Sequence, residues 1–228
     1  MQSSVATPPA RKPRHLPRTF WRIVGYGLLL LCAAIIGVPL YWMISGSLKT
    51  LQEIRTFPPV WIPDSVQWEN FTNAWNAAPF ERFYLNSIVT SLLGSGFELF
   101  FSITSAYALA FLKFPRKNLV FILLLVALMV PAQVTILPNY VTMARIDWVN
   151  TYQGIFLPGV PVAFGTFLLR QYFLGLPRDI LDAARVDGAT HFRLLWSVVV
   201  PVSIPAIVTF GLISLVAKWN EFLWPLVI

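Results

Sequence analysis

Five long apolar runs dominate this chain and restrict what it can fold into. They cover residues 23–48, 85–112, 119–137, 151–169 and 198–217, and an α-helix needs ~20 residues to cross a bilayer. Hydrocarbon offers no hydrogen bonds to peptide groups, so a spanning run has to satisfy its backbone within itself as a helix. The sequence therefore predicts an all-α fold, a polytopic transmembrane helical bundle with five spans.

The charge content points the same way. Charged residues make up 12% of the chain and hydrophobic residues 57%, whereas a soluble domain carries about 25% charge. The net charge of +7 does not indicate nucleic acid, because Lys and Arg stand in short clusters between the apolar runs. The expected partner of the apolar runs is the lipid bilayer, and no nucleic-acid partner is expected.

The basic clusters set the predicted orientation. Of 17 Lys and Arg residues, 12 fall in the N-terminal tail, in residues 113–117, or between the fourth and fifth runs. These connections share one side if the spans alternate, and Lys and Arg are enriched on the cytoplasmic side, where we place the N-terminus. The predicted organisation is a basic cytoplasmic tail (1–22) and a membrane domain (23–228), with an exterior segment (49–84) and a cytoplasmic loop (175–197).

The cytoplasmic loop carries its own helix start and stop signals. Pro177 suits a helix start, Gly188 suits the end of a helix, and Thr190 can cap the next one. Asp182 and Arg185 have the i,i+3 spacing of an ion pair. We expect a short helix, a tight bend and a second helix, and the alternative is an amphipathic helix lying on the headgroups. The predicted common apolar face comprises Leu181, Ala184, Gly188, Phe192, Leu195 and Val199.

Residues 182–201, DAARVDGATHFRLLWSVVVP, resemble the EAA motif of ABC importer permease subunits. That motif reads Glu-Ala-Ala, three residues, Gly, nine residues and Ile-x-Leu-Pro, and this chain keeps every interval. The matching positions are Asp182, Ala183, Ala184, Asp187, Gly188, Ala189, Val198, Val200 and Pro201. Asp182 departs from the motif's glutamate, and its shorter side chain reaches less far toward a basic partner group.

Other segments resemble the second permease of carbohydrate importers of the maltose and glycerol-3-phosphate type. SLKT (47–50), WENFTNAWN (68–76), SAYALAFLKFPRK (105–117) and KWNEFLWPL (218–226) follow one another in that family's order. The resemblance implies a type I ABC importer permease fold with six spans, so that residues 23–228 would form a transmembrane permease domain. Since five runs are present, we interpret the sequence as stopping before the last span.

The resemblance also implies a function and a set of partners. The chain would import a sugar or a related polyol, glycerol-3-phosphate included, across the cytoplasmic (inner) membrane of a bacterium or archaeon. It would act with a second permease subunit, two cytoplasmic ATPase subunits and an extracytoplasmic solute-binding protein, and another small solute is the alternative cargo. The residues implied to couple to the ATPase are Asp182, Ala183, Ala184, Asp187, Gly188, Ala189 and Pro201.

Glu98 is the acidic residue inside the second apolar run. A charge at the bilayer centre is costly, so Glu98 is expected to face the bundle interior or a water-filled path. Two interpretations are open: a role in the translocation path, or a structural polar contact with Ser95 or Ser102.

Two polar residues after the fifth run are further candidates for the path. Asn220 and Glu221 lie between Trp219 and Trp224, and aromatic rings stack on sugar faces. Tryptophans also gather at membrane interfaces, which is the favoured interpretation of this pair.

No catalytic motif is present in the sequence. It has neither a G-x-x-x-x-G-K-[ST] phosphate loop nor an H-E-x-x-H metal motif. We therefore expect a transport subunit rather than an enzyme, without a cofactor, with ATP hydrolysed by a partner. A membrane scaffold and a secondary transporter driven through Glu98 are the alternative functions.

Overall fold

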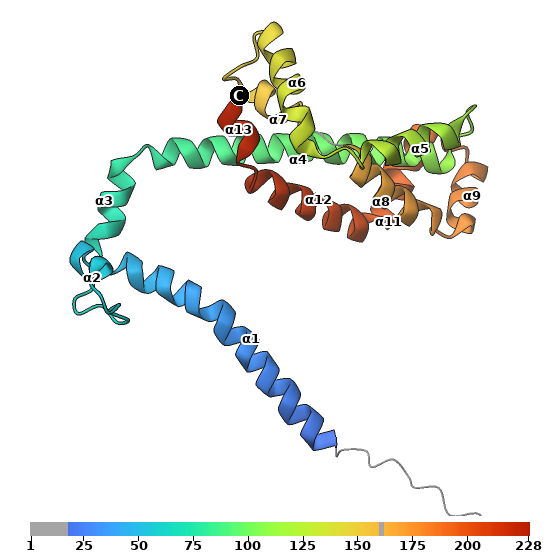
Figure 1. Cartoon of the computed structure of the whole chain (residues 1–228). Helices are drawn as coiled ribbons and strands as arrows, with labels where there is room; N and C mark the ends of the chain where they lie inside the picture. The colour runs from blue at the N-terminus through green and yellow to red at the C-terminus, as the bar shows by residue number, and fades with distance from the viewer. Residues whose placement is uncertain (1–17, 160–161) are drawn as a thin grey trace, which may run out of the picture. The chain divides into compact units, whose positions relative to one another are not determined.

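The structure, a computed structural model, describes residues 18–159 and 162–228, which form helices and no strands (Figure 1). The chain divides into two compact units, residues 1–80 and residues 81–228. The all-α prediction is confirmed. Most of the predicted tail (1–22), including Arg11, Lys12 and Arg14, lies outside the described residues, as does Pro161.

The first unit begins with the long apolar helix α1 (Arg18–Ser47), followed by α2 (Leu51–Arg55) and α3 (Glu69–Ala77). Thr50 caps α2 in a reciprocal capping box with Glu53, whose second carboxylate oxygen accepts a hydrogen bond from the Asp64 backbone N–H at 2.8 Å. The segment after α1 is therefore held in an ordered fold, although few of its large apolar side chains are buried.

Lys49 organises the connection after α1. Its side chain is buried, with Nζ donating to the Val60 carbonyl at 2.6 Å and to Ser45 Oγ at 3.2 Å. Nζ also lies 4.3 Å from the ring centre of Trp42. Hydrogen bonds and the face of an aromatic ring compensate the ammonium group for the water it loses on burial.

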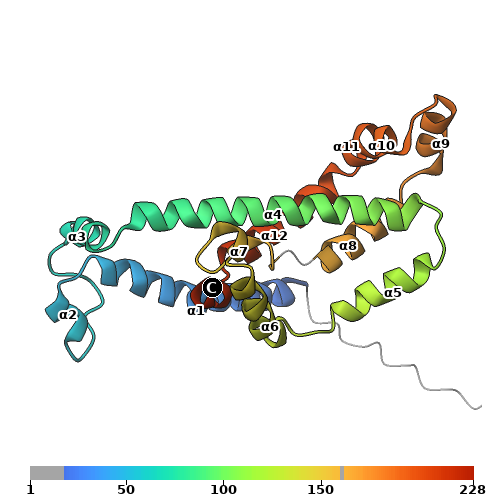
Figure 2. The ribbon, with the colours of Figure 1, turned by 90° about the horizontal axis from the view of Figure 1, so that it is seen from above.

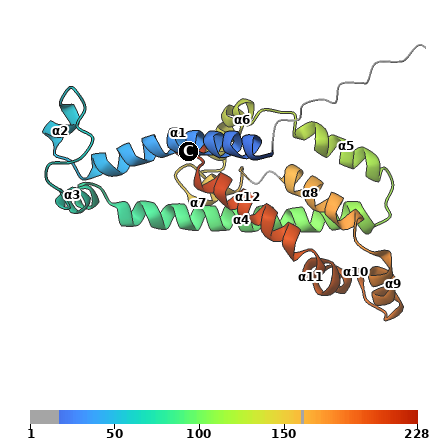
Figure 3. The same ribbon diagram turned by 90° about the horizontal axis from the view of Figure 1, so that it is seen from below.

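The second unit is built along α4 (Phe80–Phe111), a helix of 32 residues. One face of α4 carries small residues at helical spacing, Ser91, Gly94, Ser95, Ser102 and Ala106, all of them buried. Small side chains let membrane helices approach closely. This face contacts α12 (Ile204–Trp219), which crosses α4 in the view of Figure 3.

Two basic side chains donate hydrogen bonds to carbonyl groups at the C-terminal end of α4. Lys117 Nζ donates to the carbonyls of Ala110 and Leu112, each at 3.0 Å, and Arg170 Nε donates to the Leu109 carbonyl at 3.2 Å. The last carbonyls of a helix have no partner within it and carry its negative dipole end, so basic side chains stabilise this position.

The third predicted span, 119–137, is not one helix. It is divided into α5 (Lys117–Ala127) and α6 (Ala132–Arg145), which meet at 97°. Pro131 is the cause: it has no N–H for the helical ladder, and it disfavours helical geometry at the residue before it. The predicted span over 119–137 is therefore not one continuous helix, and whether the bent pair forms a single span stays a prediction.

The fourth predicted span, 151–169, is also divided. It contains α7 (Tyr152–Phe156) and most of α8 (Val162–Leu174), which packs against both α5 and α12. Within the described residues, three helices are long and apolar enough to cross a membrane, or four if the bent pair of α5 and α6 counts as one span. The count of five spans therefore stays a prediction.

The remaining helices are short. They are α9 (Arg178–Val186), α10 (His191–Leu194), the π-helical turn η1 (Leu195–Val199), α11 (Val200–Val202) and α13 (Leu223–Val227).

Candidate functional site

Residues 177–203 form a helical projection beside the end of α4, made of α9, α10, η1 and α11 (Figures 2 and 3). Pro177 precedes α9, and Asp179 lies in its first turn, at the positive end of the helix dipole. The Thr190 hydroxyl oxygen accepts a hydrogen bond from the Arg193 backbone N–H and so caps α10. The predicted helix start and the predicted second cap are confirmed.

The bend between α9 and α10 is a glycine-dependent turn. Gly188 has φ +77°, where an L side chain is strained. Its N–H donates to the Arg185 carbonyl and the Ala189 N–H donates to the Ala184 carbonyl, both at 3.0 Å. These two bonds are a complete Schellman motif, which satisfies carbonyls at the end of α9. The predicted helix end at Asp187-Gly188 is confirmed.

The outer surface of α9 carries most of the predicted coupling residues. Asp182 is 61% exposed and bonds Arg185 Nη1 at 2.6 Å, as the i,i+3 spacing predicted. Ala183, Asp187 and Gly188 are also exposed, while Ala184 and Ala189 are half-buried. Pro201 stands apart from them in α11, after the turn in which the helix leaves α geometry. Their role in coupling stays a prediction.

The inner surface of the projection is packed on the second unit. Leu181, Leu194, Leu195 and Val199 are buried in one cluster with residues of α4, α8 and α12. The predicted common face is wrong for Gly188, which is exposed, and for Phe192, which is 75% exposed. The turn at Gly188 reorients α10 relative to α9, so a spacing counted through the bend does not describe one surface.

One polar bond ties the projection to α4. His191 is exposed at the start of α10, and its Nδ1 lies 3.0 Å from the hydroxyl of Tyr107, with which it shares a hydrogen bond. Tyr107 is buried in the core cluster. The bend is therefore attached to the long helix of the unit by both packing and a directed bond.

A second feature of this unit is a cavity of about 790 Å³, lined by parts of α4, α5, α6, α8, α12 and α13. All three candidates for the translocation path, Glu98, Asn220 and Glu221, line it. The structure thus brings together residues that are more than a hundred positions apart in the sequence. Their role in a path stays a prediction.

Glu98 faces this interior and is only 5% exposed. Its carboxylate accepts a hydrogen bond of 2.5 Å from Ser214 Oγ and lies 4.0 Å from Lys218 Nζ. The predicted partners are wrong: Ser95 Oγ bonds the Ser91 carbonyl instead, and Ser102 Oγ has no partner among the described residues. Both lie on the same helix as Glu98, whereas the true partners come from α12.

Lys218 was missed by sequence reasoning. Its ammonium group donates to the Gly159 carbonyl, at the turn before α8, and is close to the Glu98 carboxylate. The available signal was its position four residues after Ser214, one helical turn apart at the end of an apolar run.

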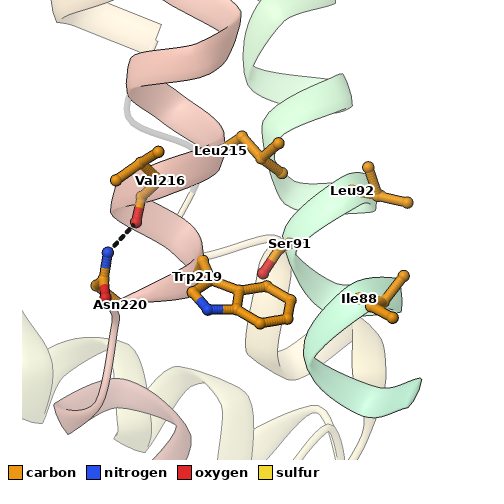
Figure 4. A pocket seen from close by; sticks show the side chains of 7 residues that line it. All are labelled: Ile88, Ser91, Leu92, Leu215, Val216, Trp219 and Asn220. Carbon is orange, nitrogen blue, oxygen red and sulfur yellow. Dashed lines mark hydrogen bonds between the residues drawn. The ribbon is translucent and has the colours of Figure 1, made fainter. Parts of the chain in front are cut away.

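The two tryptophans near the end of the described chain have different roles. Trp224 is buried, and its indole N–H donates to the carbonyls of Gly154 and Ile155 at 3.1 and 3.0 Å. Its predicted place in an interfacial belt is therefore wrong. Trp219 is exposed and lines a second, apolar cavity of about 430 Å³ between α4 and α12 (Figure 4).

Asn220 lies between the two cavities and lines both. Its side-chain amide donates to the Val216 carbonyl at 2.8 Å, the bond drawn in Figure 4. Within residues 18–159 and 162–228, no group of three or more His, Cys, Asp or Glu side chains is placed to hold a metal ion.

Membrane-length apolar helices, a cavity with charged residues in its lining and a helical projection are the features that a membrane permease would need. The chain belongs to the family of binding-protein-dependent transport system inner membrane components, whose model matches residues 98–228. The predicted family is thereby confirmed.

Relatives and a solved structure agree with the family. The chain is 36% identical over 212 residues to the sn-glycerol-3-phosphate transport system permease protein of Pectobacterium atrosepticum, covering 90% of this chain and 75% of that protein. It is 34% identical over 217 residues to the Escherichia coli K12 protein of that name, covering 92% and 77%.

The fold is similar to that of a chain in a bacterial ABC transporter involved in the import of the acidic polysaccharide alginate. The TM-score is 0.83 with 23% identity, and the match covers 93% of this chain and 76% of that one. The predicted type of fold is confirmed by this similarity.

Proposed function

We propose that this chain is the permease subunit that forms one half of the translocation path of an ATP-driven importer for a sugar or related polyol, glycerol-3-phosphate included. It performs no bond chemistry, and a separate ATPase hydrolyses ATP. The observation that carries the proposal is that one packed unit holds both the exposed helix α9 and the polar cavity around Glu98. The names of the relatives support the class of cargo.

Residues 182–189 are the proposed docking surface for the ATPase. Asp182 presents a carboxylate, and Ala183 is small enough to allow close approach. Val186 and Phe192, which are 87% and 75% exposed, are the most exposed large apolar side chains of this projection. Exposed apolar side chains rimmed by charges are typical of a surface that binds another protein.

The packing of the projection supports a mechanical role. A force on α9 acts on the core through Leu181, and a force on the bend acts on α4 through the His191–Tyr107 bond. Packed cores pass displacement on because they are dense and resist compression. In the proposed mechanism, closure of the ATPase moves the projection, and α4 and α12 then change the access of the cavity from one side to the other.

The proposed assembly contains a second permease subunit, two cytoplasmic ATPase subunits and an extracytoplasmic solute-binding protein. It lies in the inner membrane of a bacterium or archaeon with the N-terminus in the cytoplasm. This orientation places residues 175–197 on the ATPase side and residues 49–84 on the side of the binding protein.

Co-purification with the ATPase and ATP-dependent uptake test the proposal. Asp182→Arg reverses the charge on α9, and we expect both the bound ATPase and uptake to be lost. Lys113→Glu is the control, because Lys113 is exposed on another connection of the same predicted side and its charge also reverses, by two units in the opposite direction. If the Asp182→Arg variant still binds the ATPase and still takes up the solute, the proposed docking role of α9 is wrong.

A further inference from the structure

The lining of the 790 Å³ cavity has more acidic residues than basic residues. Among the described residues that line it, three are ionisable, Glu98, Lys218 and Glu221, and their formal charges add up to −1. A cavity walled by protein focuses the field of such groups and sets which ions enter it.

Lys218 is the one basic residue among the described residues of this lining, and its ammonium group already has partners within the chain. It donates to the Gly159 carbonyl and faces the Glu98 carboxylate, and its side chain is 12% exposed. Its stem is held against α4, since a Cβ added at Gly94 would lie 3.5 Å from Lys218 Cδ. An incoming anion that drew Lys218 away would leave Glu98 buried without its counter-charge, which is strongly unfavourable.

Glu221 lies close to the same place. A Cβ added at Gly159 would lie 3.3 Å from Lys218 Nζ and 3.8 Å from Glu221 Oε2, so both groups stand beside this turn. An anion that approaches the ammonium group at Gly159 therefore meets a second carboxylate. Two acids around one bound lysine repel a phosphate or carboxylate ligand.

The other polar groups of the cavity are neutral. Gln133 and Asn139 line it, and their amides make no side-chain hydrogen bond within the described part of the chain. An amide offers two donors and an acceptor, and a hydroxyl group of a solute can use either kind. Phe164 and Phe222 add apolar surface beside them. This set of groups suits a polyhydroxylated molecule without charge.

We propose that this chain's half of the path excludes anions and admits an uncharged polyhydroxyl solute, a sugar or polyol without a phosphate group. This inference rests on the proposed function and narrows its cargo. The cargo proposed here also differs from the solute in the names of the relatives, which is sn-glycerol-3-phosphate. Glu221 is assigned as the residue that determines this selectivity, because Lys218 offsets the charge of Glu98.

The charge selectivity can be measured without knowledge of the cargo. Cys32, the single cysteine of the chain, is replaced by serine, and Gln133→Cys places one thiol in the cavity. The assembled complex in lipid nanodiscs is labelled with 2-trimethylammonioethyl and with 2-sulfonatoethyl methanethiosulfonate, and each rate is divided by the rate with free cysteine. We expect the cationic reagent to react roughly five- to tenfold faster, because a negative potential attracts it and repels the anionic reagent.

When Glu221→Gln is combined with Gln133→Cys, the ratio of the cationic to the anionic labelling rate should fall by at least half. Because only this chain is changed, the fall measures the contribution of this chain and not that of the second permease. Asp147→Asn is the matched control, because Asp147 is an exposed acid that does not line the cavity. Its ratio should equal that of Gln133→Cys alone.

Several results would overturn the inference. They are equal or faster labelling by the anionic reagent, no labelling by either, an unchanged ratio in Glu221→Gln, or ATP-driven uptake of sn-glycerol 3-phosphate by the wild-type complex. The last of these leaves the proposed function intact. Conversely, a chain that binds no ATPase would contradict the proposed function whatever the labelling ratio shows.

Discussion

The hydroxyl of Ser214 donates a 2.5 Å hydrogen bond to the carboxylate of Glu98 across 116 positions of sequence. This bond joins α12 to the middle of α4, and Lys218, one turn further along α12, lies 4.0 Å from the same carboxylate. Burial of a carboxylate is costly without hydrogen bonds and a counter-charge, and α12 supplies both. The contact between the two longest helices of the second unit is therefore specified by polar groups as well as by small residues.

The Glu98–Lys218 pair should show strong coupling. Lys218→Met leaves Glu98 without its counter-charge, and we expect a loss of about 3 kcal/mol in the free energy of unfolding in detergent. The double variant with Glu98→Gln should regain most of that loss, because no uncompensated charge remains. A double-mutant cycle of thermal unfolding measures the coupling. Additive losses in the cycle would show that the two charges do not interact.

Two buried serines on facing helices should respond differently to removal of their hydroxyl group. Ser214→Ala deletes a bond to a charged acceptor and should cost about 1.5–3 kcal/mol of stability. Ser102→Ala deletes a buried hydroxyl that has no partner among the described residues, so stability should stay the same or rise. Thermal unfolding of both variants under one condition checks the difference, and a large loss for Ser102→Ala would reveal a partner of this hydroxyl.

The helical projection was predictable because its signals are local. Pro177, Gly188 and Thr190 act on backbone groups within a few residues of themselves. Pro177 precedes the start of α9, Gly188 forms the turn at its end, and Thr190 caps α10, as predicted. The orientation of Phe192 was not predictable by counting, since it depends on the rotation of the chain at the Gly188 turn. The predicted common apolar face is wrong at Phe192 for this reason, and at Gly188 because the turn itself is exposed.

The cavity was predictable only in part. The cost of burying a charge singled out Glu98 and predicted that it faces the interior, which the structure confirms. Its partners lie on α12, and pairing between helices depends on how they cross, which periodicity along one helix does not encode. The break at Pro131 was visible in the sequence, but membrane helices often tolerate proline, so its presence alone did not decide between a kink and a 97° bend.

The connection after α1 should loosen in acid. Hydrogen bonds from the backbone N–H groups of Asp64 and Thr50 lower the pKa of the Glu53 carboxyl below its ordinary 4.5. A lowered pKa in the folded state means that Glu53 contributes stability above pH 4.5 and that this contribution is lost as the pH falls through the folded-state value.

Hydrogen exchange of the Asp64 amide tests this expectation. After correction for the intrinsic exchange rate, its protection should fall as the pH drops below about 4.5, and Glu53→Gln should lose most of this pH dependence. The amide of Asn70, whose N–H donates to the Gln67 carbonyl in the same segment, serves as the internal control. Protection at Asp64 that does not change with pH in the wild type would contradict the assigned role of Glu53.

Two glycines offer a matched test of close helix packing. Gly165 on α8 faces the ring of Phe210 and the hydroxyl of Ser102, and a Cβ added there would overlap both. Gly165→Ala should therefore destabilise the second unit by about 1–3 kcal/mol, since a dense core accommodates an extra methyl only by shifting its neighbours. Gly96→Ala on α4 meets nothing within 4 Å and should be neutral or stabilising, because alanine favours helix more than glycine does. Thermal unfolding of the two variants in one detergent gives the comparison, and equal stability for both would show that α8 does not pack against α4 and α12 through Gly165.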